Sequence, residues 1–146
     1  MMKTIEARFV PMVMPAARRE RRKAPFTATY TDTERLLERE LRMLQARHVV
    51  IQLDCDESQI RRDGLPRSDA RLRSPAVVLS FESRFGPLSY PADAFNRWES
   101  NLRAIALALE ALRLVDRYGV TRNAEQYRGW KAITYRGDVQ FQNPEA

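Results

Sequence analysis

A single histidine and a single cysteine are the first residues to consider for chemistry. His48 and Cys55 lie seven positions apart on one predicted strand, 48–55. Because side chains alternate between the two faces of a strand, this odd offset places them on opposite faces. The spacing argues against a nucleophile and base pair, and one Cys with one His cannot supply the four ligands of a Cys and His zinc site.

An acidic group directly after this strand offers a second chemistry. Asp54 and Asp56 share a face, and together with Glu57 they could hold Mg²⁺ through carboxylate oxygens. Glu82 and Arg84 follow the next predicted strand. This order resembles the pattern of metal-dependent PD-(D/E)xK nucleases, although no proline precedes Asp54 and an arginine stands at the lysine position. A nuclease is the third and least favoured of three functional interpretations.

The glycines exclude the common nucleotide-binding loops. All five are scattered, and neither GxxxxGK[ST] nor GxGxxG occurs in the chain. In the favoured interpretation, which sets the nuclease pattern aside, we expect no cofactor, no bound metal and no catalytic residue.

Basic residues interleaved with aromatic residues are the remaining chemical signal. The net charge of the 146 residues is +6, and residues 1–25 carry +5 of it, with seven basic and two acidic side chains. Such residues can neutralise phosphates and offer aromatic faces on which bases stack. The predicted nucleic-acid-binding residues are Arg18, Arg19, Arg21, Arg22, Lys23, Arg128, Trp130 and Lys131.

The N-terminal half is predicted to present the basic run on a hairpin. Alternation over 4–10 and the β-branched and aromatic run 26–30 predict two paired strands, with residues 18–23 on their solvent-exposed loop. Thr31 and Glu34 then form a capping signature for a helix that runs from about Thr33 to Ala46.

The middle of the chain is predicted to contain a long loop and a hairpin. Residues 56–75 lack a sustained period, so they are expected to form a loop with at most one helical turn near 57–61. Loops of this length are usually functional or mobile. The runs 76–83 and 88–91 predict a β-hairpin with Gly86 in its turn.

A long helix over 94–118 is the strongest prediction, with Asp93 as its cap and Gly119 at its end. Its apolar residues form two stripes, so it is either central to the domain or covered by a partner. The second stripe, within 104–118, predicts a protein interface that could serve a homodimer. The interface residues are Leu107, Ala111, Leu114 and Tyr118.

These elements predict one α+β domain over 1–146. Its mainly antiparallel sheet of about five strands is packed by two helices, the second long and central. Residues 1–25 form a basic arm or hairpin, and 137–146 form a frayed tail. No apolar run approaches a membrane span and no signal peptide is apparent, so a cytoplasmic location is expected.

The segments VVLSFESRFGPLSYPADAF (77–95) and RWESNLRAIALALEALRLVDRYGVTRNAEQYRGW (97–130) resemble a module of DnaJ-like proteins of actinobacteria and their phages, where it precedes the J domain. The similarity extends from about Tyr30 to Ile133 and implies an α+β accessory module of a high-G+C bacterium or mobile element. The His-Pro-Asp tripeptide of a J domain is absent, because His48, the only histidine, precedes Val49.

The favoured interpretation is a non-catalytic accessory protein of a phage or mobile element that binds nucleic acid or a nucleoprotein partner through the basic arm. The alternative is a protein–protein adaptor or chaperone-related module that uses the 104–118 helix as its interface.

Overall fold

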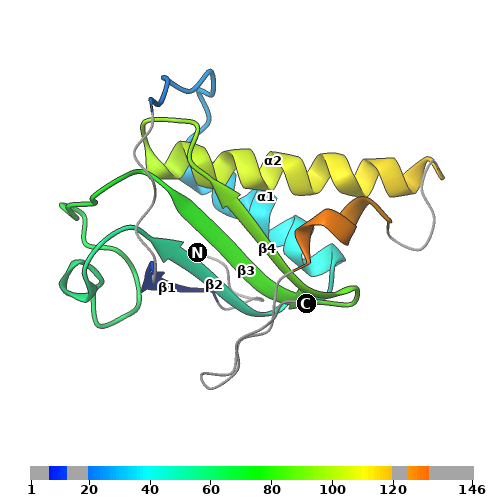
Figure 1. The fold of residues 1–146 in the computed structure, drawn as a ribbon, viewed down its shortest axis with the longest axis horizontal. Coiled ribbons are helices and arrows are strands. Elements are labelled where there is room, and N and C mark those ends of the chain that lie inside the picture. The colour runs from blue at the N-terminus through cyan, green and yellow to red at the C-terminus, as the bar shows by residue number, and fades with distance from the viewer. Residues whose placement is uncertain (1–6, 13–19, 120–124, 132–146) are drawn as a thin grey trace, which may run out of the picture.

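Two helices pack on one face of a four-stranded sheet in a computed structural model, which describes residues 7–12, 20–119 and 125–131. The strand order is β1 (Ala7–Pro11), β2 (Arg47–Leu53), β3 (Val77–Ser83) and β4 (Gly86–Ala92). β1 runs parallel to β2, and the other neighbouring pairs are antiparallel. The helices are α1 (Tyr30–Met43) and α2 (Trp98–Arg117), as Figure 1 shows. The predicted α+β class is confirmed, with four strands among the described residues where about five were expected.

The predicted hairpin of 4–10 with 26–30 is wrong. β1 lies beside β2 with Phe9 opposite Ile51, and residues 26–29 belong to no strand. Parallel neighbours require a long crossover connection, and α1 supplies it. The alternation in the sequence does mark a strand with one buried face, but alternation does not specify which strand pairs with it.

α1 begins at Tyr30 rather than Thr33, because a different threonine caps it. The Thr29 hydroxyl accepts a hydrogen bond from the Asp32 backbone at 3.2 Å, and the Asp32 carboxylate accepts one from the Thr29 backbone at 3.1 Å. This is a capping box of the predicted kind, formed two residues before the predicted one. Thr31 therefore lies within the first helical turn.

α2 begins later than predicted, with Arg97 at the N-cap in place of Asp93. The reason is the buried side chain of Asn101, which accepts a hydrogen bond from the Phe95 backbone at 3.0 Å and donates one to its carbonyl at 3.1 Å. The same amide donates to the Pro75 carbonyl at 2.8 Å. These bonds occupy the Phe95 backbone groups that a longer helix would need. The predicted end is confirmed, since Gly119 follows with a φ of +70°.

The core lies between the helices and the inward face of the sheet. Alternate residues of every strand contribute to it, among them Phe9, Ile51, Leu79 and Tyr90. The short helix η2 (Glu125–Trp130) packs against β4 and α2, and it buries Tyr127. Thr33 contacts Arg103 near the start of both helices, and Glu40 contacts Arg113 further along both. These two contacts show that the helices run parallel.

The loop and hairpin predictions in the middle of the chain are confirmed. β3 and β4 form the hairpin, with Gly86 at a φ of +103°. The loop at 56–75 contains one short helix, η1 (Glu57–Gln59). The rest of this loop is held by its own backbone bonds, such as Arg67 to the Gln59 carbonyl at 2.8 Å. The loop therefore has a defined conformation, and it covers one end of the sheet.

Candidate functional site

The basic segment 20–25 lies against the body of the protein. The Arg22 backbone N–H donates to the Ala94 carbonyl at 3.0 Å, and the Arg22 carbonyl accepts from Asn96 at 3.0 Å. The Arg21 guanidinium donates to the Asp93 carbonyl at 3.1 Å. The expectation that the basic run lies on the projecting loop of a hairpin is therefore wrong for residues 20–23, whose backbone is held against the body of the protein.

The side chains of this segment differ in exposure. Arg21 is largely buried, whereas Arg22 and Lys23 are exposed. The Arg22 guanidinium lies over the Phe95 ring, 5.2 Å from its centroid. Arg18 and Arg19 lie outside the described residues.

The second predicted basic group lies at the other end of α2. Trp130 stacks on Tyr90 with 4.9 Å between ring centroids, and the Lys131 ammonium donates to the Phe85 carbonyl. Arg128 is exposed beside them. In Figure 1 this segment (η2, orange) lies far from residues 20–25 (blue). The two predicted basic groups therefore lie at different places on the molecule.

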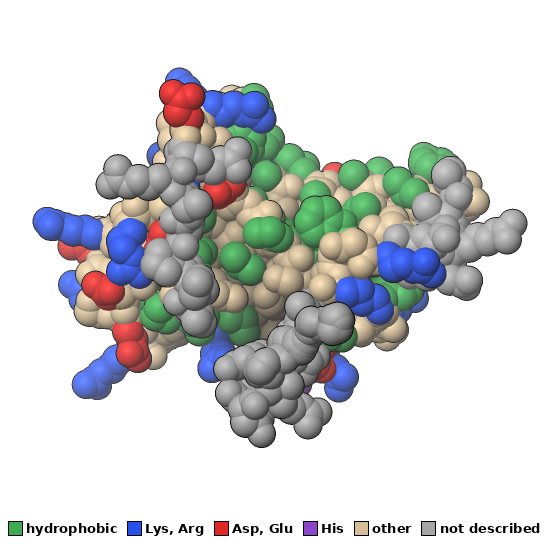
Figure 2. Space-filling view, viewed as in Figure 1, with side chains coloured by type: hydrophobic (Ala, Val, Ile, Leu, Met, Phe, Trp, Pro, Cys, Tyr) green, Lys and Arg blue, Asp and Glu red, His purple; other side chains and the backbone are tan. Residues whose placement is uncertain are grey.

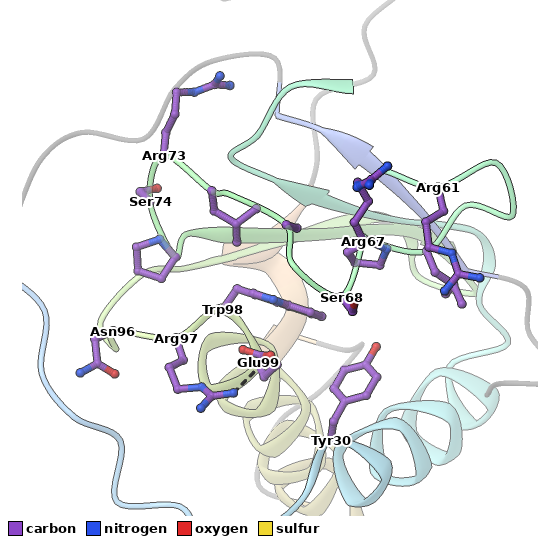
Figure 3. Close-up of a pocket in the computed structure, with 15 residues that line it drawn as sticks. Tyr30, Arg61, Arg67, Ser68, Arg73, Ser74, Asn96, Arg97, Trp98 and Glu99 are labelled. Atoms are coloured by element: carbon purple, nitrogen blue, oxygen red, sulfur yellow. Dashed lines mark hydrogen bonds and ion pairs between the residues drawn. The ribbon is translucent and has the colours of Figure 1, made fainter. Parts of the chain in front are cut away.

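A pocket of about 620 Å³ opens where both helices begin. The start of α1, the start of α2 and the 56–75 loop supply its walls. We call it the arginine pocket, and its defining residues are Tyr30, Arg61, Arg67, Arg73, Arg97 and Trp98. In Figure 3, Trp98 lies between Arg97 on one side and Arg61 and Arg67 on the other, and the Tyr30 hydroxyl points into the space.

Three arginines of the pocket have weak partners. Arg61 pairs with Asp63 at 2.9 Å, Arg67 with Asp69 at 3.5 Å and Arg97 with Glu99 at 3.4 Å. Each of these arginine side chains is more than half exposed. Such surface pairs contribute little, so the guanidiniums can turn to an anionic ligand at small cost. Figure 2 shows blue and red side chains mixed at this end of the molecule.

The fourth arginine, Arg73, anchors the loop. Its guanidinium donates to the buried carboxylate of Asp54 at 3.1 Å and to Asp56 at 2.8 Å. Ser74 also donates to Asp54, at 2.6 Å. Hydrogen bonds to Asp56 and Asp54 raise the pKa of Arg73. Asp54 and Asp56 thus hold the loop in place through Arg73 and Ser74.

The described residues do not bring together the carboxylates of the predicted nuclease pattern. Leu53 pairs with Val77 and Arg47 with Glu82, so Asp54 and Glu82 lie at opposite ends of neighbouring strands, roughly 17–20 Å apart. Glu57 lies in η1, and no three His, Cys, Asp or Glu side chains in the described parts of the chain approach closely enough to hold a metal ion.

The separation of His48 and Cys55 is confirmed. His48 is exposed at an irregularity of β2, with a φ of +55°. Cys55 is buried beyond the far end of the same strand, and burial raises the pKa of its thiol. The two side chains therefore cannot act together.

The predicted interface residues lie along the outer face of α2. Leu107 and Leu114 are half-buried, Ala111 is exposed and Tyr118 is 74% exposed. Figure 2 shows hydrophobic side chains gathered along this helix. The second apolar stripe is thus incompletely covered within the described residues.

The pocket aromatics are functional candidates that the sequence analysis missed. Trp98 has the helical spacing of a core residue, and it does contact Phe9 with 5.7 Å between ring centroids. Tyr30 was assigned to a strand. Burial, with smaller contributions from Glu34 and Glu99, raises the pKa of Tyr30, so its hydroxyl stays protonated at neutral pH. The length of the 56–75 loop was the one signal that pointed to this region.

Comparisons with known proteins give no family assignment. No protein-family model, no curated protein and no solved structure matches the chain. Among the described helices, none combines the length and the hydropathy required to cross a bilayer.

Proposed function

We propose that this protein binds nucleic acid at the end of the molecule where α1 and α2 begin. One observation carries the proposal: exposed Arg22 and Lys23 are held beside Ala94–Asn96, next to the arginine pocket. We further propose that the protein is a non-catalytic accessory protein of a phage or mobile element and that it acts in the cytoplasm.

Phosphate is the ligand group that suits these side chains best. Arginine presents a planar set of donors that matches phosphate oxygens, and neutralised phosphates release their counterions. The parallel helices both direct the positive ends of their dipoles toward this region. Acidic residues near the same arginines limit the local net charge and hence the expected affinity. Binding should still weaken as salt is added, because each phosphate contact releases counterions.

A labelled single strand of about 20 nucleotides tests the proposal by fluorescence anisotropy at about 50 and 200 mM salt. The variant Arg22→Ala/Lys23→Ala should weaken binding and reduce the salt slope by about 0.7 for each lost phosphate contact. The matched control is Arg128→Ala/Lys131→Ala, which removes two basic side chains from the other end and should leave the slope unchanged.

Two outcomes would contradict this function. Absence of salt-sensitive binding at about 50 mM salt would refute nucleic-acid binding itself. An equal loss of affinity in the control variant would refute the assignment to the end where the helices begin.

A second candidate function is protein–protein binding through the outer face of α2. The observation in its favour is the exposure of Ala111 and Tyr118 on an apolar stripe. Self-association is its most direct form, and light scattering at micromolar protein tests it. A dimer that Leu114→Lys dissociates would support this function, and a strictly monomeric mass would remove the homodimer.

A further inference from the structure

The arginine pocket has the size and the mixed lining of a ligand site. Its volume of about 620 Å³ falls within the range of about 300–1,000 Å³ that small-molecule sites occupy. Aromatic, cationic and neutral polar side chains share the lining, the last including Ser68 and Asn96. A ligand with a flat ring, hydrogen-bonding edges and negative charge would match all three kinds of side chain.

Trp98 is positioned to receive the flat ring. Its two aromatic neighbours meet it at steep angles, Phe9 at 79° and Tyr30 at 65°. These edge contacts hold the indole in place, and no described aromatic ring lies parallel to it. Because Trp98 also lines the pocket, a base can stack on the indole, an interaction that contributes substantially to single-strand binding.

The arginines are positioned to receive the charge. Arg97 lies on one side of Trp98, with Arg61 and Arg67 on the other (Figure 3). Their partners are exposed aspartates and a glutamate at 2.9–3.5 Å. A phosphate group beside the ring could replace these partners at little cost, because exposed pairs are weak.

We infer that the arginine pocket takes one unpaired base of a single-stranded nucleic acid, stacked on Trp98, with the flanking phosphates on Arg61, Arg67 and Arg97. This inference rests on the proposed function and adds to it a preference for single-stranded over double-stranded nucleic acid. Bases in a duplex are stacked and paired, so only a single strand or an extruded base can enter the pocket.

The test uses Trp98 as its own reporter. The chain has two tryptophans, so the Trp130→Phe variant leaves Trp98 alone while keeping an aromatic ring on Tyr90. Oligothymidylate and oligouridylate of about 12 nucleotides are titrated against a duplex of equal length. Both single strands should quench Trp98 fluorescence and bind at least about 5-fold more tightly than the duplex.

A blocking variant separates the pocket from the surrounding charge. Ser68→Phe places a large side chain at an exposed lining position and removes no core contact. It should abolish the quenching and the preference for single strands. Ser58→Phe is the matched control, since Ser58 is exposed on the same loop outside the pocket, and it should retain both properties.

The outcomes distinguish this inference from the proposed function. The pocket assignment would be overturned if single strand and duplex bind equally well in a salt-sensitive way, without quenching Trp98 and without any effect of Ser68→Phe. The proposed function would then remain intact. If no polymer binds, both proposals are overturned, and quenching of Trp98 by thymidine monophosphate would then identify the pocket as a site for free nucleotides.

Discussion

The buried ion pair between α1 and α2 gives a quantitative prediction. The Glu40 carboxylate is 1% exposed, and it accepts hydrogen bonds from Arg113 Nε at 2.8 Å and Nη2 at 3.0 Å. The Arg113→Met variant keeps an apolar side chain but leaves this carboxylate without its main partner. Breaking one side of a buried pair costs about 3–5 kcal/mol.

The expected loss lies at the lower end of that range. The Arg113 side chain is 26% exposed, and Arg39 Nε remains 3.4 Å from Glu40. We therefore expect a loss of about 3 kcal/mol in the free energy of unfolding. For a chain of this size the melting temperature, measured by circular dichroism at neutral pH, should fall by roughly 6–12 °C.

A neighbouring pair across the same two helices provides the control. Arg39 and Glu110 are 2.7 Å apart, but their side chains are 53% and 33% exposed. Glu110→Gln should therefore cost less than about 1 kcal/mol. If Arg113→Met loses no more stability than this control, the reasoning from burial is refuted.

A double variant separates charge from packing. Glu40→Met/Arg113→Met removes both charges and should return to within about 1 kcal/mol of the wild type. A double variant as unstable as Arg113→Met would show that the loss comes from packing.

Three other predictions concern single side chains. Thr29→Ala removes the α1 cap and should cost about 1 kcal/mol, or roughly 2–4 °C in melting temperature. Hydrogen bonds from the Thr29 backbone and hydroxyl lower the pKa of Asp32 below its ordinary 3.8, so the stabilisation by Asp32 is present above that value and is lost as the pH falls through the lower folded pKa. The Thr29→Ala variant keeps the backbone N–H that donates to the Asp32 carboxylate, so both proteins should lose this stabilisation in acid melts, and the difference between them should narrow only by the hydroxyl contribution. Tyr90→Phe should keep or raise the melting temperature, because the buried Tyr90 hydroxyl has no hydrogen-bond partner among the described residues; a fall of more than roughly 4 °C would contradict this. Burial raises the pKa of Cys55, so iodoacetamide at about pH 8 should alkylate it slowly until denaturant is added, and rapid labelling of the folded protein would show that the thiol is accessible.

Local sequence patterns predicted the helices and strands of this fold better than they predicted which strands pair with one another. The long helix and the β3–β4 hairpin depend on neighbouring residues, and both form close to the expected positions. The start of α1 was misplaced because two overlapping capping signatures, at Thr29 and Thr31, fit the same stretch. The pairing of β1 with β2 depends on residues about 40 positions apart, which no periodicity encodes.

The candidate site was less predictable because distant contacts assemble it. Arg22 reaches its position through backbone bonds to Ala94 and Asn96, and the loop is anchored by Arg73 on Asp54. Trp98 has the spacing of a core residue and is partly one. The sequence spacing could not show that the same indole also lines a pocket, because the loop forms the opposite wall.

Two prolines in the edge strand β4 restrict how copies of this protein can assemble. Pro87 and Pro91 lie on β4, opposite Glu82 and Val78, and a proline in a paired strand must sit where its missing N–H faces away from the neighbour. The outer edge of β4 thus lacks two donors, and Lys131 bridges to Leu88 between them. Another strand would find few backbone partners along this edge, which disfavours growth into fibres by strand addition.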